Sequence, residues 1–157
     1  MNNTFFLIFI IGLCLFAIGK TIYYFIEKKK VLTTCKNPDS IEIKNITGTI
    51  FTDGGNNKRL ELCTFNLLIN ENSIFLFTLS LSFMPLHIIN LLFSNKNRKN
   101  TRHSILLREY KIDDGKVILV YHPGYVPRLK KITFENLNPE QLSILEKTLE
   151  GKSRRMY

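Results

Sequence analysis

Residues 5–26 read FFLIFIIGLCLFAIGKTIYYFI, and Lys20 is the single charged side chain among them. An α-helix rises about 1.5 Å per residue, so about 20 apolar residues cross a hydrocarbon core of roughly 30 Å. Lys20 lies near the C-terminal end of the run, where its aliphatic stem lets the amine reach the headgroup level. The run therefore predicts a transmembrane anchor, to which we assign residues 1–27.

Residues typical of a membrane interface come at the end of this run. Tyr23 and Tyr24 occupy the level that amphipathic aromatic side chains favour, and the run is ended by Lys28, Lys29 and Lys30. The four residues before the run, MNNT, carry no charged side chain. The positive-inside tendency then predicts a single-pass protein of the plasma (inner) membrane whose C-terminal domain is cytoplasmic.

An N-terminal apolar run can also be a cleaved secretory signal or a lipoprotein signal. A cleaved signal needs a basic start and a small-x-small cleavage site, and neither is evident in this sequence. A lipoprotein signal at Cys14 needs a small residue where Leu13 stands and a basic residue before the apolar run. Both alternatives are less favoured than a retained helix.

A second apolar run, residues 74–93, contains no Asp, Glu, Lys or Arg and is long enough to span a membrane. Within it, residues 77–83 read FTLSLSF, and this alternation is typical of a half-buried strand. Pro85, His87 and Asn90 crowd the second half. A span here would also place the basic cluster that follows on the side opposite the first one. We expect a strand up to residue 83 and one or two helical turns after Pro85, with a two-span membrane protein as the alternative.

The rest of the chain predicts a linker, a folded domain and a tail. Residues 28–40 combine a Lys cluster with an Asn-Pro turn and predict a basic linker; residues 41–151 predict a β-rich domain, and residues 152–157 a basic tail. The sequence DGGNN at 53–57 indicates a hairpin turn, because Gly and Asn tolerate positive φ. About six antiparallel strands are expected, at 41–52, 59–69, 73–83, 104–110, 116–121 and 127–134.

The apolar patterns of two segments indicate which side chains face the core. In the first strand, one side is formed, with a single slip in the alternation, by Ile41, Ile43, Ile46 and Ile50. Near the C-terminus, Asn138 is a good N-cap, Pro139 suits the first helical position and Gly151 is a natural terminator. The helix between them is expected to pack on the sheet through Leu142, Leu145 and Leu149, with Ile144 at the edge of this face.

Strands followed by one amphipathic helix, ending in the run ITFENLNPEQLSILEKTL at 132–149, resemble the pleckstrin-homology-like (PH-like) superfold in bacterial forms that follow a membrane helix. The resemblance covers about residues 41–149 and rests on the order of the elements. It implies an α+β domain with a barrel-like or curled sheet closed by the C-terminal helix. It also implies a binding or scaffolding module rather than an enzyme.

No constellation of catalytic or metal-ligating residues stands out. His87, His103 and His122 have no acidic or histidine partner at a metal-ligand spacing. The Gly pair at 54–55 lacks the spacing of a phosphate loop, and no Ser lies in a GxSxG turn. Cys63 alternates within a strand and is expected to be a small core residue. We predict no catalytic residue, no metal and no cofactor, and a protein that is not an enzyme.

Positive charge is the clearest surface property, since the chain has 22 Lys and Arg against 13 Asp and Glu, a net charge of +9. A domain tethered beside an anionic leaflet gains about 1 kcal/mol for each Lys or Arg held near the surface. Contacts with lipid or a partner are expected at two clusters, Lys96, Arg98, Lys99 and Arg102 in a polar loop and Arg128, Lys130 and Lys131 further on. The alternative is a solvated loop with ordinary positive-inside bias.

Together these features predict a membrane-anchored, non-catalytic interaction module whose partners are the bilayer and either anionic headgroups or an acidic protein. A nucleic-acid partner is not expected, because the basic loop has no interleaved aromatic side chains for base stacking. A membrane-bound immunity or inhibitor protein that neutralises a toxin is the alternative, since small size, an anchor and a lack of catalytic groups fit it too. The oligomeric state stays open.

Overall fold

The computed structural model describes residues 3–55, 57–80, 84–94, 104–124, 128–152 and 154–155. It divides the chain into two compact units, Met1–Cys35 and Lys36–Tyr157. The first unit is a single helix, and the second is a sheet with one further helix. This is the α+β layout that the sequence predicts, an apolar N-terminal helix followed by a sheet and a C-terminal helix.

Helix α1 runs from Asn3 to Cys35 and is apolar on all sides over its first part. Its large apolar side chains between Phe5 and Ile26 are exposed, which suits a lipid environment. In the described part of the chain, Phe5–Cys35 is the helix long and apolar enough to cross a membrane. Its 33 residues measure about 50 Å, so the last third extends beyond a hydrocarbon core of roughly 30 Å.

The prediction of a linker over residues 28–40 is wrong for its first part, because α1 continues through the Lys cluster to Cys35. Strong helix formers at 27–30 (EKKK) and the absence of Gly or Pro between residue 27 and Pro38 explain the continuation. The remaining residues, 36–40, form a turn that belongs to the second unit.

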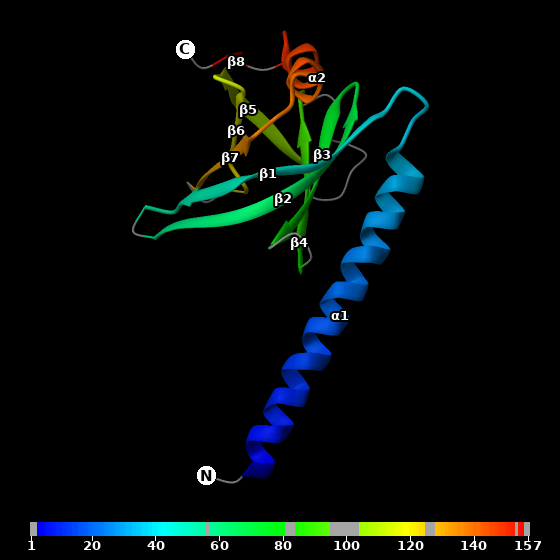
Figure 1. The fold of residues 1–157 in the computed structure, drawn as a ribbon, viewed down its shortest axis with the longest axis vertical. Helices are drawn as coiled ribbons and strands as arrows, with labels where there is room; N and C mark the ends of the chain where they lie inside the picture. The colour runs from blue at the N-terminus through cyan, green and yellow to red at the C-terminus, as the bar shows by residue number, and fades with distance from the viewer. Residues whose placement is uncertain are drawn as a thin grey trace. The chain divides into compact units, whose positions relative to one another are not determined.

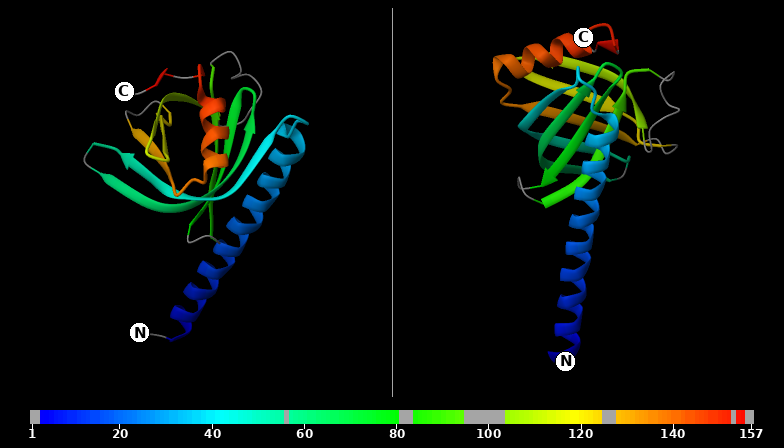
Figure 2. Two further views of the ribbon diagram at one scale, coloured as in Figure 1. Left: turned by 45° about the horizontal axis from the view of Figure 1, so that its top comes forward. Right: turned by 90° about the vertical axis from the view of Figure 1, so that its right-hand side faces the viewer.

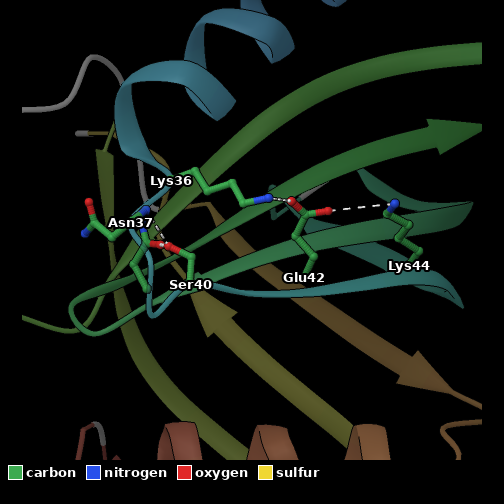
Figure 3. Close-up of polar contacts among 6 residues, drawn as sticks. Lys36, Asn37, Ser40, Glu42 and Lys44 are labelled. Atoms are coloured by element: carbon green, nitrogen blue, oxygen red, sulfur yellow. Dashed lines mark hydrogen bonds and ion pairs between the residues drawn. The ribbon is translucent and has the colours of Figure 1, made fainter.

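This turn is fastened to the sheet by side chains (Figure 3). The Lys36 ammonium lies 2.7 Å from the Glu42 carboxylate, and the Asn37 backbone N–H donates to Ser40 Oγ at 2.8 Å. Ser40 Oγ in turn donates to Asn70 Oδ1 at 2.6 Å. The turn therefore connects the start of the first strand with the end of the second.

The described residues of the second unit form seven strands and a short eighth one, labelled in Figure 1. Their bounds are β1 Ile41–Asp53, β2 Lys58–Asn70, β3 Ser73–Ser80, β4 Met84–Leu92, β5 Ser104–Asp113, β6 Lys116–Tyr121, β7 Leu129–Glu135 and β8 Arg154–Arg155. The strands form one sheet in the order β4-β3-β2-β1-β7-β6-β5-β8, and β4 also pairs with β5. The sheet therefore closes on itself through seven strands. Six strands were expected, and the additional one is β4.

The core lies inside this closed sheet. Side chains from all seven strands contribute, and Phe65 of β2 meets Phe134 of β7 edge to face with ring centroids 5.2 Å apart. Helix α2, Pro139–Leu149, lies against the curled sheet (Figure 2) and contributes two fully buried side chains, Leu145 and Leu149. The C-terminal helix therefore closes the core, as the sequence predicts.

The ends of α2 also match the prediction. The Asn138 side chain accepts from the Gln141 backbone N–H at 2.7 Å, and the Gln141 side chain accepts from the Asn138 N–H at 3.0 Å. Two N–H groups that the helix leaves unpaired are thus satisfied reciprocally. Pro139 occupies the first turn, and Gly151 has a positive φ of 71° just after the helix.

The prediction of helical turns after Pro85 is wrong, because this segment is strand β4. It pairs antiparallel with β3 and, at Asn90–Leu92, parallel with β5. Pro85 stands near the start of the strand, where its missing N–H is tolerated. A register shift beside it is filled by Thr78, whose hydroxyl donates to the His87 carbonyl at 2.5 Å and accepts from the His87 N–H at 3.1 Å. The described part of residues 74–93 thus forms two strands in place of a second spanning helix.

Strand β1 confirms the predicted slip in its apolar alternation. The pairing with β2 shifts register between Ile43 and Ile46, and Asn45 takes a positive φ of 59° there. Ile43, Ile46 and Ile50 are buried as expected, whereas Ile41 is 42% exposed at the start of the strand. The extra residue keeps both halves of β1 facing the core.

Candidate functional site

A cleft of about 620 Å³ lies on the second unit beside strands β5 and β6. Its walls combine apolar side chains with four that carry or can carry charge. The lining residues are Phe93, Leu106, Leu107, Arg108, Glu109, Val120, His122, Leu129 and Lys152. This volume falls within the range of small-ligand sites, which is about 300–1,000 Å³.

A bulge in β5 shapes the cleft. Leu107 pairs with Tyr121 and Glu109 pairs with Val120, so Arg108 is the extra residue of the bulge. An extra residue of this kind bends the strand and redirects side chains, and such bulges are common beside functional sites. Arg108 is exposed and Glu109 half-buried, and both line the cleft.

The turn after α2 brings Lys152 to the cleft. The Lys152 N–H donates to the Leu149 carbonyl at 3.1 Å, and the positive φ of Gly151 permits this reversal. The chain then continues into β8, where Arg154 pairs with Glu109 of β5. A residue of the predicted tail is thereby positioned by the C-terminal end of the helix.

His122 is held in place by the backbone of Arg128. Its Nδ1 lies 3.2 Å from the Arg128 carbonyl oxygen. Because a carbonyl oxygen only accepts, this contact requires the hydrogen on Nδ1, which leaves Nε2 for other contacts. The lining holds two cations, Arg108 and Lys152, against one carboxylate, Glu109, so the cleft favours an anionic ligand.

The first predicted basic cluster, Lys96, Arg98, Lys99 and Arg102, lies outside the described residues. The described residues on either side of it are nevertheless informative. Phe93 precedes the segment and Leu106 follows it, and both line the cleft. Described residues on both sides of this segment in the sequence therefore line the cleft.

The second predicted cluster is divided by the structure. Arg128 is exposed, and its side chain lies beside Gly54 in the β1–β2 turn. Lys130 and Lys131 are half-buried neighbours on β7 and so point to opposite faces of the sheet. The three side chains do not form one surface, although Arg128 and Leu129 connect this segment to the cleft.

The residues predicted at the membrane interface all lie on α1. Tyr23 and Tyr24 are 18 and 19 positions after Phe5, a distance of nearly 30 Å along the helix. Tyr23 is exposed, and the ring of Tyr24 meets that of Phe25 edge to face at 5.7 Å. The Lys cluster at 28–30 follows one turn later. This spacing matches one hydrocarbon thickness between Phe5 and the tyrosines.

A second polar group lies on β2 and β6, at the inner side of the sheet. Cys63 is buried, as predicted, and its pKa is raised from 9.0 to about 11 by burial and by the nearby Glu61 carboxylate. Burial is also the main cause that raises the pKa of Tyr121, with Glu61 and Cys63 adding to it. Glu61 is balanced by Arg59, whose Nε lies 2.8 Å from its carboxylate. These conditions suppress the thiolate.

Cys63 is therefore expected to resist alkylation. In a Cys14→Ser, Cys35→Ser chain at pH 8, its ionisation alone should lower the rate about 100-fold relative to a thiol with a pKa of 9.0. Maleimide labelling followed by mass spectrometry measures the rate. The control carries Leu62→Cys and Cys63→Ser, since Leu62 is the exposed neighbour on the same strand.

Equal labelling of the two thiols would contradict the described environment.

The pH dependence of folding stability gives a second readout, because a pKa that differs between the folded and unfolded states links protonation to folding. A raised native pKa means that the folded state holds the proton more tightly. Stability is then complete below pH 9 and is lost as the pH rises through about 11.

In the described part of the chain, no group of three or more His, Cys, Asp and Glu side chains is arranged to hold a metal ion. Comparison with protein-family models finds no matching family, and comparison with curated proteins finds no matching relative. The case for the cleft as a functional site is therefore made from its geometry and charge alone.

Sequence reasoning missed most of the cleft. Arg108, Glu109, His122 and Lys152 come from separate segments and form no motif. The bulge that exposes Arg108 leaves no signature in the pattern of β5. The one available signal was His122 beside Pro123-Gly124, which indicates a turn where side chains from different strands can meet.

Proposed function

We propose that this protein is a single-pass, membrane-anchored, non-catalytic interaction module of bacterial type, with a PH-like domain at the cytoplasmic membrane face. Its ligand in this proposal is an anionic lipid headgroup. The observation that carries the proposal is the cleft lined by Arg108, His122 and Lys152 against a single carboxylate. A phosphate group would receive charge-assisted hydrogen bonds from such side chains.

Two further features support a lipid ligand rather than an arbitrary anion. Helix α1 is long and apolar enough to hold the domain beside a bilayer, and its Lys cluster follows the apolar part directly. The basic residues of segment 96–102 lie in the sequence between Phe93 and Leu106, which both line the cleft. Each cation held near an anionic surface contributes about 1 kcal/mol, so the segment and the cleft would act together.

The test uses the full chain in nanodiscs of phosphatidylcholine. Short-chain phosphatidylglycerol, kept below its micelle concentration, is titrated by calorimetry, with short-chain phosphatidylcholine as the neutral comparison. Combining Arg108→Gln and Lys152→Gln should lower the affinity roughly 30-fold, because two cations at about 1 kcal/mol each are removed and 1.4 kcal/mol is a factor of ten.

The matched control removes two exposed cations elsewhere, Lys116 at the start of β6 and Lys147 on α2, by the same change to Gln. The net charge is then equal in both variants. An equal loss of affinity in the two variants would mean non-specific attraction and would refute the cleft as the binding site. Glycerol phosphate is titrated as a separate arm. Binding of glycerol phosphate as tight as that of the lipid would identify a soluble phosphate ligand instead.

A further inference from the structure

Two leucines of β2 are exposed side by side on the outer face of the sheet. Leu60 is 64% exposed and Leu62 is 70% exposed, and among the described residues of the second unit they are the most exposed large apolar side chains. They alternate with Glu61 and with Cys63, and Cys63 belongs to the core, so the leucines point away from it. Apolar side chains grouped on a surface indicate contact with a membrane or with a protein.

The pairing of the strands extends this surface across the sheet. Residues directly opposite one another share a face, and Phe51 of β1, which is half-buried, lies opposite Leu60. Lys131 of β7 lies opposite Phe51, and Val120 of β6 lies opposite Lys131. Val120 lines the cleft, so one row of the outer face leads from the leucines to the cleft over three strand spacings, about 15 Å.

Lysines border the leucines on this face. Lys58 is exposed two positions before Leu60, and Lys131 is the second neighbour of Leu60 across the sheet. Asp53, opposite Lys58, uses a carboxylate oxygen to accept from the Gly55 N–H at 3.0 Å. Leucines beside lysines suit a bilayer surface, because the apolar side chains enter the boundary of the acyl chains while the ammonium groups stay at the level of the headgroups.

The chain is long enough for these leucines to meet the bilayer that α1 is able to span. Cys35, the last residue of α1, is nine positions after Ile26, a length of about 14 Å beyond the apolar run. Ile69, which pairs with Ile41 at the start of β1, is nine positions after Leu60, a length of about 30 Å along β2. The strand therefore exceeds the part of the helix that extends beyond the hydrocarbon core.

We propose that Leu60 and Leu62 insert into the boundary between headgroups and acyl chains, so that the outer face of the β1–β2 hairpin is a second membrane contact. The occupant is lipid rather than protein because the anchor holds the domain beside a bilayer and because lysines border the leucines. This contact goes beyond the proposed headgroup ligand. It requires the anchor but not the cleft, so either proposal can fail alone.

Quenching of tryptophan fluorescence by brominated lipid tests the contact. The native chain has no Trp, so a single introduced Trp reports alone. Thr49→Trp places the ring opposite Leu62 on the outer face and leaves both leucines in place. The full chain is reconstituted in vesicles of phosphatidylcholine whose acyl chains are brominated near the headgroup end. These neutral vesicles offer no anionic headgroup, so the result does not depend on the cleft.

Ser143→Trp is the matched control, because Ser143 is exposed on α2, and α2 packs on the inner side of the curled sheet (Figure 2). We expect several-fold stronger quenching for Thr49→Trp than for Ser143→Trp. Adding Leu60→Ser and Leu62→Ser to Thr49→Trp should lower the quenching to the level of Ser143→Trp. Both leucines are exposed, so this variant should keep the native circular dichroism spectrum.

Three results would overturn the second membrane contact. One is equal quenching of Thr49→Trp and Ser143→Trp. Another is quenching of Thr49→Trp that persists after both leucines are replaced. The third is a Thr49→Trp ring that is shielded from aqueous iodide but not quenched by brominated lipid, which would identify a protein partner such as a second copy. Strong quenching in a chain that fails to bind short-chain phosphatidylglycerol would support this contact and refute the cleft alone.

Discussion

Replacing Gly48 by Ala is expected to destabilise the second unit by at least about 3 kcal/mol, and replacing it by Val should prevent folding. A Cβ atom built on Gly48 collides with the Thr133 carbonyl oxygen and comes within 3.2 Å of the Phe134 Cα atom. Overpacking costs about 1–3 kcal/mol where side chains can rearrange, and here the obstacle is backbone. Strands β1 and β7 pair with each other at this point.

Chemical denaturation of the full chain in detergent, followed by far-ultraviolet circular dichroism, measures this effect. Gly54→Ala is the matched control, because the nearest atoms to its Cβ lie at 3.4 Å and beyond. It should remain close to the native chain. A Gly48→Ala chain as stable as the Gly54→Ala chain would show that β1 and β7 are not in close contact.

Replacing Phe134 by Ala should lower the free energy of unfolding by about 3–5 kcal/mol, the usual cost of deleting a buried aromatic ring. The ring is fully buried and packs edge to face on Phe65. It also lies on β7 between β1 and β6, opposite Gly48 and Val117. Removal of the ring would leave a cavity, and the surrounding strands cannot move in to fill it because each is paired with its neighbours.

Phe51→Ala is the matched control, since Phe51 is half-buried on the adjacent strand and its side chain points to the other face. Its loss should be clearly smaller. A double-mutant cycle between Phe65 and Phe134 should give a coupling of about 0.5–1.5 kcal/mol, as found for aromatic pairs. Similar losses in the free energy of unfolding for Phe51→Ala and Phe134→Ala would contradict a core on the face of the sheet that Phe134 occupies.

Most of the second unit could be predicted from local patterns. The turn at 53–57, the slip within β1 and the cap at Asn138 each have a local chemical cause, so they are visible in the sequence. Strand β4 could not be predicted in this way. It reads MPLHIINLL and lacks alternation, because adjacent residues such as Leu91 and Leu92 are both buried. A short apolar run of this kind is consistent with either a strand or a helix.

The cleft depended on tertiary arrangement. Its charged residues are brought together by the β5 bulge, by the turn after α2 and by the pairing of Arg154 with Glu109. None of these is encoded by spacing along one element. The side chains of the predicted cluster at 128–131 are separated for the opposite reason. Its residues are adjacent in sequence, but strand alternation separates Lys130 from Lys131.

The strand order also has a consequence for synthesis on the ribosome. From β1 to β4, each strand pairs with the one made just before it, so these hairpins can form as the chain emerges. The outer edge of β1 is different, because its partner is β7. Thr47 must wait for Glu135, 88 residues later. During that interval the edge is unpaired and open to association with other chains. Closure of the sheet is therefore a late event, and we expect chains truncated before residue 129 to be retained by chaperones or to aggregate.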